Sequence, residues 1–293
     1  MDTEYYDLER RGTFETVPTS SAGKAFIIPV RWVYTYKFDK NGYLTKYKAR
    51  LVVRGDLQRH SIHEETYAAT LAARTFRALC AIANHFDLEM YQYDAVNAFT
   101  NSNIDEEIFV RCPEGYLKEG HCLKLIKALY GLRRSPRLWF LDISSKLEAL
   151  GFVRTPEAQC LFTTSTLTVF FYVDDIVVLY HRSNKADFLE FQRRLLETYE
   201  LRDIGELKFF LGIRVIRDRV EKRLWLCQDD YISKIVSTFN LQDSKCPTVP
   251  LATDDLYPYK AQATPQEIHG YQSRVGSINY AAVVTRPDMS RTA

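Results

Sequence analysis

Apolar residues recur at helical spacing in four stretches of the chain, and we expect an α-helix in each. The stretches are 70–86, 136–150, 185–200 and 230–241. Ser135 and the proline that follows it are expected to begin the second helix, with the serine as its N-cap. Between several of these stretches, apolar and polar residues alternate or form short apolar runs, as in β-strands.

Strand-like patterns occupy much of the remaining sequence. Residues 88–94 alternate between apolar and polar positions and end on Asp94. Two short apolar runs, 168–173 and 176–180, predict a buried hairpin with a pair of aspartates at its tip. A second strand pair is expected at 207–216 and 223–228, and the Pro- and Thr-rich segment 245–270 predicts a loop.

Positive charge is concentrated in residues 31–60, which hold eight basic residues and two acidic ones. The β-branched and aromatic residues of this segment predict a hairpin with an Asn-Gly turn at 41–42. One face of its second strand would carry Lys46, Lys48 and Arg50, where three cations could meet phosphate oxygens. A solvated basic strand face is the alternative.

Composition describes a globular protein. The 293 residues are 46% hydrophobic and 26% charged, which is enough for one large domain or two ordinary ones. The 39 Lys and Arg against 37 Asp and Glu give a net charge of +2, so a nucleic-acid partner must be argued from where the charges lie. Six cysteines without a CxxC pair indicate a reducing compartment. Because no leader or bilayer-length apolar run is evident, we expect a soluble protein that is not secreted and has no membrane partner.

The adjacent aspartates of the apolar hairpin, Asp174 and Asp175, are the strongest candidates for chemistry. Neighbouring like charges repel, and a turn without them would avoid this, so the pair calls for a cation. Hard carboxylate oxygens favour Mg²⁺ or Mn²⁺, and Asp94 at the end of its own strand could supply a third ligand. A polar β-turn without a metal is the alternative. The acidic run 105–107 lies among polar neighbours and is expected to be a loop or the start of a helix, without a site.

Six segments, in order, resemble the Ty1/copia class of retrotransposon reverse transcriptases. The resemblance extends from about Val17 to Met289. Its strongest part is the tetrad 172–175 in FYVDDIVVL, which is similar to the YxDD hairpin of reverse transcriptases. The other segments are RWVYTYKFDKNGYLTKYKARLVVRG, YQYDAVNAFTNSNIDEEIFVRCPEGY, LKLIKALYGLRRSPRLWF, DIGELKFFLGIRV and YQSRVGSINYAAVVTRPDMS.

The resemblance implies an α+β, right-hand polymerase fold with fingers, a partial thumb, and a palm made of an antiparallel sheet with helices on one face. The expected division has an N-terminal extension, fingers in two segments, a palm in two segments, and a thumb with the start of the connection. In residues these are 1–25 for the extension, 26–87 and 110–155 for the fingers, 88–109 and 156–216 for the palm, and 217–293 for the thumb, truncated before a ribonuclease H.

The resemblance also implies an RNA-directed DNA polymerase that transfers nucleotides from dNTPs to a primer on an RNA or DNA template. Two Mg²⁺ ions, for which Mn²⁺ can substitute, would be held by Asp94, Asp174 and Asp175. Phe99 would exclude a ribose 2′-hydroxyl, although a core role suits an aromatic at this spacing too. The other implied residues are Lys48, Arg50, Tyr130 and Gly131 at the nucleotide, and Phe210, Leu211 and Gly212 at the primer. The implied location is a retroelement particle in the cytoplasm, or the nucleus.

The chain departs from the family pattern at several positions. Arg134 stands where the family has Gln, and Thr100 and Ser102 stand where the family text AFLNG has Leu and Gly. Because the sequence stops soon after TRPDMS, we expect a fragment of a Pol polyprotein. A catalytically silent nucleic-acid-binding remnant is one alternative, and a segment that does not fold stably is another.

Overall fold

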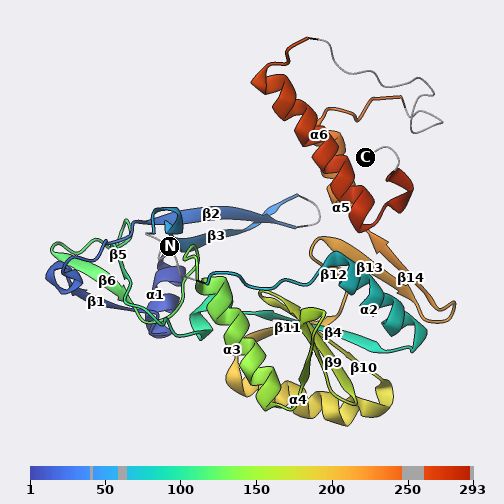
Figure 1. Cartoon of the computed structure of the whole chain (residues 1–293), viewed down its shortest axis with the longest axis horizontal. Coiled ribbons are helices and arrows are strands. Elements are labelled where there is room, and N and C mark those ends of the chain that lie inside the picture. Colours follow the sequence, from blue (N-terminus) through green and yellow to red (C-terminus); the bar gives the residue numbers. More distant parts are fainter. Residues whose placement is uncertain (40–41, 59–64, 246–260, 291–293) are drawn as a thin grey trace. The chain divides into compact units, whose positions relative to one another are not determined.

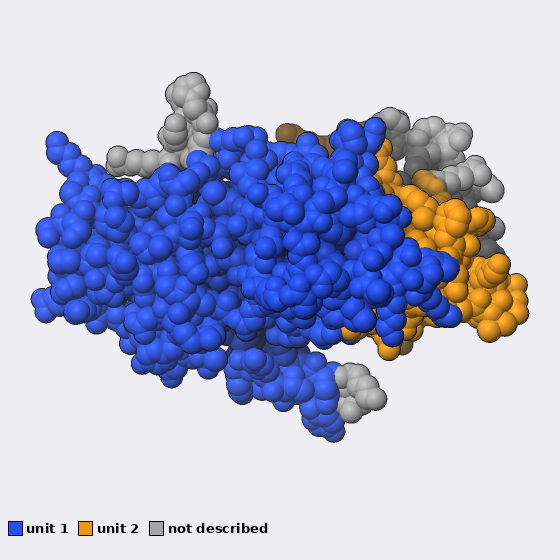
Figure 2. Space-filling view, turned by 90° about the horizontal axis from the view of Figure 1, so that it is seen from below, with its two compact units in different colours: residues 1–71, 92–204 blue, residues 72–91, 205–293 orange. Residues whose placement is uncertain are grey.

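A computed structural model of the chain describes residues 1–39, 42–58, 65–245 and 261–290. The chain forms two compact units, each assembled from two separate segments (Figure 2). The first unit consists of residues 1–71 and 92–204, and the second of residues 72–91 and 205–293. Helices and strands are both abundant and the sheets are antiparallel at every pairing given below, so the predicted α+β class is confirmed at this level (Figure 1).

The N-terminal part of the first unit is a small sheet with a helix on it. Its strands are β1 (Phe14–Pro18), β5 (Phe109–Val110) and β6 (His121–Leu125), in the order β1-β6-β5. Both neighbouring pairs are antiparallel. Helix α1 (Asp2–Arg10) buries Tyr5 and Leu8 in the core of this region, which also includes Leu51 and Val53 of the basic hairpin.

The basic hairpin is formed by β2 (Val30–Phe38) and β3 (Leu44–Val53), which pair antiparallel. Its register sets Lys46 opposite Lys37 and Lys48 opposite Thr35. Lys46, Lys48 and Arg50 alternate along β3 and therefore share a face, which confirms the prediction, and Lys37 lies on the same face opposite Lys46. The predicted turn includes Asn41, which lies outside the described residues.

A six-stranded sheet, in the order β11-β4-β10-β9-β8-β7, carries the candidate acidic residues on two of its strands and on the turn between β9 and β10. Strands β7 to β10 pair antiparallel with one another. Two helices lie against the sheet (Figure 1), with Phe140 of one near Phe171 and Phe188 of the other stacked on Tyr180. The elements are β4 (Glu89–Ala95), α3 (Ser135–Ala149), β7 (Val153–Thr155), β8 (Ala158–Thr163), β9 (Leu167–Tyr172), β10 (Asp175–Tyr180), α4 (Lys185–Thr198) and β11 (Leu201–Glu206).

The second unit contains helices and a three-stranded sheet of order β12-β13-β14. Its elements are α2 (Ala73–His85), β12 (Phe209–Phe210), β13 (Ile213–Asp218), β14 (Arg223–Cys227), α5 (Asp229–Thr238) and α6 (Pro265–Val284). The prediction of a single strand over 207–216 was wrong, because a two-residue turn at 211–212 separates β12 from β13. No helix within the described ranges is long and apolar enough to cross a bilayer.

Helix α6 corrects the loop predicted for 245–270. It begins at Pro265, and the Thr264 side chain and the Glu267 side chain cap each other's backbone N–H groups. This capping box explains why a Pro- and Thr-containing stretch starts a helix here, since proline is favoured in the first helical turn. The part of the predicted loop at 246–260 lies outside the described residues.

Candidate active site

The turn between β9 and β10 carries the adjacent aspartates. Asp175 pairs with Tyr172, so the turn consists of Val173 and Asp174, and Asp175 is the first residue of β10. The buried hairpin is confirmed, but the prediction that both aspartates lie at its tip was wrong for Asp175. Backbone φ is +53° at Val173 and is not positive at Asp174, which is the pattern of a type II′ turn. Strain of about 1 to 3 kcal/mol is expected for a β-branched residue there, so neighbouring groups must hold the turn.

Two hydrogen bonds hold this turn. The indole Nε1 of Trp139, on α3, donates to the Val173 carbonyl at 2.7 Å. The backbone N–H of Ala95, on β4, donates to the Asp174 carbonyl at 2.8 Å, and this bond brings Asp94 next to the turn. Trp139 was not predicted from the sequence, because a helical pattern does not distinguish an indole that donates a hydrogen bond from one that only packs.

Asp175 and Asp94 each have a polar side chain as a partner. Gln92 Nε2 donates to Asp175 Oδ1 at 2.8 Å, and Arg202 lies 3.1 Å from the Asp94 carboxylate. Gln92 was also missed, although its position two residues before Asp94 on one strand places both on the same face. Within the part of the chain that the structure describes, no three Asp, Glu, His or Cys side chains are grouped closely enough to hold a metal ion as they stand.

The pKa values of the partly buried aspartates are nevertheless those expected of carboxylates that lack a bound cation. Burial raises the pKa of Asp174, and the Asp94 carboxylate adds to the effect while Arg50 and Lys48 oppose it. Burial also raises the pKa of Asp175, and the other two carboxylates add to that effect. Three carboxylates supply hard oxygen donors, and a cation would relieve the cost of ionising Asp174 and Asp175, so the donor set suits Mg²⁺ or Mn²⁺.

Lys48, Arg50 and Tyr130 lie close enough to interact electrostatically with Asp174. The Arg50 guanidinium lies 5.8 Å from the centre of the Tyr130 ring, and Tyr130 meets Phe99 edge-on at a ring-centre distance of 4.8 Å. Burial raises the pKa of Tyr130 to about 12, with the Asp174 charge adding to the effect. Burial and the neighbouring Arg50 lower the pKa of Lys48. Phe99 is 8% exposed, so it is a core residue whose ring also contacts the predicted nucleotide site.

Gly131 serves a close approach of two backbones. The Val53 N–H donates to the Tyr130 carbonyl at 2.8 Å, which joins the 130–131 loop to the end of β3. Gly131 has φ of +90°, and a Cβ there would lie 2.1 Å from the Val53 carbonyl oxygen. Gly55 is equally constrained, since a Cβ on it would lie 2.0 Å from the Gly131 oxygen. The loop that carries Tyr130 is therefore fixed to the strand that carries Lys48 and Arg50.

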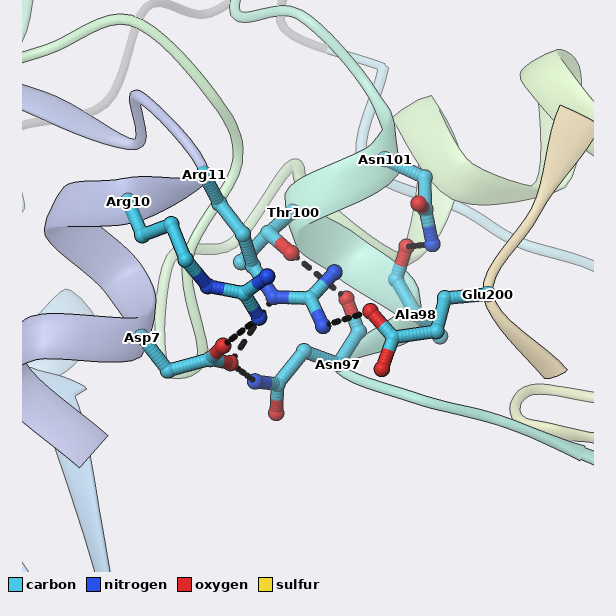
Figure 3. A network of polar contacts seen from close by, with 8 residues as sticks. All are labelled: Asp7, Arg10, Arg11, Asn97, Ala98, Thr100, Asn101 and Glu200. Atoms are coloured by element: carbon cyan, nitrogen blue, oxygen red, sulfur yellow. Dashed lines mark hydrogen bonds and ion pairs between the residues drawn. The ribbon is translucent and has the colours of Figure 1, made fainter. Parts of the chain in front are cut away.

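The segment after Asp94 forms a tight turn that contains the first two departures from the family text, Thr100 and Ser102, and Figure 3 shows Thr100 in it. Asn97 has φ of +50°, and residues 98–101 form a short 3₁₀ turn. The Thr100 hydroxyl donates to the Asn97 carbonyl at 2.9 Å, so this buried polar group is satisfied. Ser102 has φ of −98°, which any residue adopts, so the backbone does not require the family glycine.

The third departure, Arg134, is neutralised locally. Its guanidinium forms an ion pair with Asp105, in the acidic run for which no site was expected. The predicted N-cap was wrong: helix α3 begins at Ser135 with Arg134 as its cap residue, and the Ser135 hydroxyl donates to the Leu129 carbonyl at 2.7 Å. The serine therefore fixes the preceding loop instead of capping the helix.

The three residues expected at a primer lie in the second unit. Leu211 and Gly212 form the turn between β12 and β13, with φ of +51° and +77°. Phe210 is 1% exposed and stacks on Phe76 at a ring-centre distance of 4.7 Å. These residues form a turn and part of a core, not the continuous strand that was expected.

Comparison with known proteins agrees with the resemblance read from the motifs. Residues 12–253 match the family described as reverse transcriptase (RNA-dependent DNA polymerase). The retrovirus-related Pol polyprotein from transposon TNT 1-94 of Nicotiana tabacum is 30% identical over 99% of this chain and 23% of its own length. The corresponding polyprotein from transposon RE1 of Arabidopsis thaliana is 31% identical over 95% of this chain and 19% of its own length. The chain thus spans about a fifth of these relatives.

Among solved structures, one similar chain is a foamy viral protease-reverse transcriptase in complex with double-stranded DNA. It is 16% identical, with a TM-score of 0.46, over 94% of this chain and 38% of the viral one.

Proposed function

Because this chain belongs to the reverse transcriptase family, we propose that it is the RNA-directed DNA polymerase region of a retrotransposon Pol polyprotein. It would add deoxynucleotides from dNTPs to the 3′-hydroxyl of a primer paired with an RNA or DNA template. The observation that carries the proposal is the hydrogen bond from the Ala95 amide to Asp174. This bond brings Asp94 next to the β9–β10 turn, within electrostatic reach of Lys48 and Arg50.

The residues that would hold divalent ions are Asp94, Asp174 and Asp175, and we propose two Mg²⁺, with Mn²⁺ as a substitute. When bound, such ions lower the pKa of the primer hydroxyl and neutralise charge on the transferred phosphoryl group. The chain itself orients the Asp175 carboxylate through Gln92. Arg202 balances the charge of Asp94 through a pair whose arginine is 65% exposed. Such exposed pairs contribute about 0 to 1 kcal/mol, so this one can open when a stronger cation arrives.

Lys48 and Arg50 are the proposed triphosphate ligands. Arg50 offers a planar fork suited to two phosphate oxygens, and Lys48 offers a compact charge. The Tyr130 ring beside Arg50 limits where its guanidinium can lie. Phe99, in contact with Tyr130, is the proposed residue that excludes a ribose 2′-hydroxyl.

The proposed subdomains keep the boundaries expected from the sequence. The proposed palm is residues 88–109 and 156–216, which hold β4, β8 to β11 and α4, and the proposed fingers are residues 26–87 and 110–155, which hold the basic hairpin, β6 and α3. The thumb would lie within residues 217–293, and the turn at 211–212 remains the proposed contact to a primer. Template and primer are the proposed partners of these parts.

Primer extension on an RNA template tests the proposal. The wild-type chain with dNTPs and Mg²⁺ should extend the primer, and the Asp174→Asn, Asp175→Asn double variant should lose extension almost completely. Asp187→Asn is a suitable control, because Asp187 is an exposed residue in the first turn of α4. Equal extension by wild type and double variant would refute the assignment.

The silent-remnant alternative makes a different prediction for the same material. It expects salt-dependent binding of a primer–template by the wild-type chain without any extension in Mg²⁺ or Mn²⁺. Binding measured at two salt concentrations beside the extension assay separates the two functions.

A further inference from the structure

The N-terminal helix α1 contacts the turn that follows Asp94. The Asp7 carboxylate accepts a hydrogen bond from Asn97 Nδ2 at 2.9 Å and another from Arg11 Nε at 2.8 Å (Figure 3). The other side of the Arg11 guanidinium pairs with Glu200. Although burial acts to raise the pKa of Asp7, hydrogen bonds from Arg10 and Arg11 hold it below its ordinary value, so the acceptor is ionised at neutral pH.

Asn97 is the residue through which this contact reaches the candidate site. It lies between Asp94 and Phe99 and adopts a left-handed backbone conformation, in which Asn is enriched among residues other than glycine. The residue before it is held as well, since the Val96 N–H donates to the Glu200 carbonyl at 3.0 Å. The turn is thus fixed by α1 on one side and by the residue preceding β11 on the other.

The same helix also contacts the strand that carries the triphosphate candidates. The Glu4 carboxylate accepts a hydrogen bond from the Leu51 backbone N–H, and Lys48 and Arg50 act on its charge. Its Oε1 atom is buried without a hydrogen-bond partner. Residues of one helix, a single turn apart, therefore contact β3 and the turn before Phe99, which form two sides of the candidate nucleotide site.

We propose that α1 is a positioning element for nucleotide selection, in which Asp7 fixes Asn97 and thereby the placement of Phe99. The inference rests on the proposed polymerase function. It adds that the preference for deoxynucleotides over ribonucleotides depends on a helix that donates no group to the nucleotide. It also assigns a role to residues 2–10, which precede the segment matched by the family.

Four variants test the proposal, one of them as a control. Asp7→Ala removes the acceptor for Asn97, whereas Asp7→Asn retains one oxygen in its place and should restore much of the function. Arg10→Ala is the matched control, because Arg10 also bonds Asp7 but has a side chain 70% exposed and no bond to Asn97. Asn97→Gly tests the same contact from the other side, since glycine accepts the left-handed conformation without strain.

The decisive measurement is the ratio of kcat/KM for dATP to that for ATP. We expect Asp7→Ala and Asn97→Gly each to lower this ratio about tenfold, the change produced by about 1.4 kcal/mol, and we expect the double variant to lose little more. Arg10→Ala should keep the wild-type ratio. A merely structural role would lower the melting temperature and reduce both kcat/KM values equally, and that result would overturn the proposal.

Hydrogen exchange gives a readout that does not depend on turnover. Amides of residues 95–101 should exchange faster in Asp7→Ala than in wild type or Arg10→Ala, and unchanged exchange would overturn the positioning role. If the wild-type chain does not extend primers, the polymerase proposal fails separately. Equilibrium binding of dATP and ATP then decides the selection claim, because an Asp7→Ala chain with the wild-type ratio of affinities would contradict it.

Discussion

Replacing Trp139 by Phe should disturb the β9–β10 turn specifically. The indole N–H that donates to the Val173 carbonyl is lost, while most of the buried ring is kept. Trp139 is 1% exposed and packs edge-on against Tyr199 at a ring-centre distance of 5.2 Å. Water is therefore poorly placed to replace the lost donor.

Two contributions set the expected loss of stability. A buried carbonyl left without its donor costs about 1 to 3 kcal/mol. The smaller ring adds roughly 1 to 2 kcal/mol, as part of the 3 to 5 kcal/mol typical of truncating a buried tryptophan to alanine. We therefore expect a loss of about 2 to 5 kcal/mol. Because Val173 is strained, the turn should also relax, and misplacement of a catalytic group by about 1 Å can cost about 100-fold in turnover.

Urea unfolding and primer extension should be measured on the same preparations. Phe162→Leu is the control, since Phe162 is a fully buried residue of β8 in the same sheet with no hydrogen bond to the turn. It should lose roughly 1 to 2 kcal/mol of stability and keep wild-type extension per folded molecule. If Trp139→Phe keeps it too, the indole does not position the turn and the reasoning is refuted.

Three further substitutions give measurable outcomes. Asp174→Asn should raise the urea midpoint at pH 7, because the raised pKa of Asp174 in the folded state means that the folded chain favours the neutral carboxyl. The gain in stability should shrink as the pH falls toward 4, where wild-type Asp174 is itself protonated, and a gain independent of pH would contradict this reasoning. Gly131→Ala should lower the free energy of unfolding by at least about 2 kcal/mol more than Gly151→Ala does, since both glycines have φ near +90° but only Gly131 has backbone within 3 Å of a new Cβ. Arg202→Ala should lower the Mg²⁺ concentration for half-maximal extension about two- to fivefold, because it removes a cation paired with Asp94, and an increased requirement would count against that competition.

The parts of the structure that the sequence predicted well are those with strong local periodicity. The apolar runs around Asp174 and Asp175 identified a buried hairpin, and the alternating cations of β3 identified a charged strand face. Both signals arise within about ten residues, where side-chain period and turn chemistry act directly.

The supports of the candidate site could not be predicted in this way. Asn97 and Asp7 are 90 residues apart, and Arg11 and Glu200 are 189 apart. A polar contact between such distant positions leaves no periodic trace, because each residue alone suits any exposed position. The start of helix α6 was not predicted for a different reason. Pro265 indicates a loop unless Thr264 and Glu267 beside it are recognised as a capping box.

The position of β4 in its sheet has a consequence for how the chain acquires its fold. β4 lies between β10 and β11, both of which are made long after it. During synthesis, both edges of β4 therefore remain unpaired until residues near 206 have emerged. Unpaired edges favour association with other chains, and pairing between strands far apart in the sequence favours slow folding. We expect recovery from denaturant to be slow and dependent on protein concentration, and expression at low temperature or with a chaperone to increase the yield of folded chain.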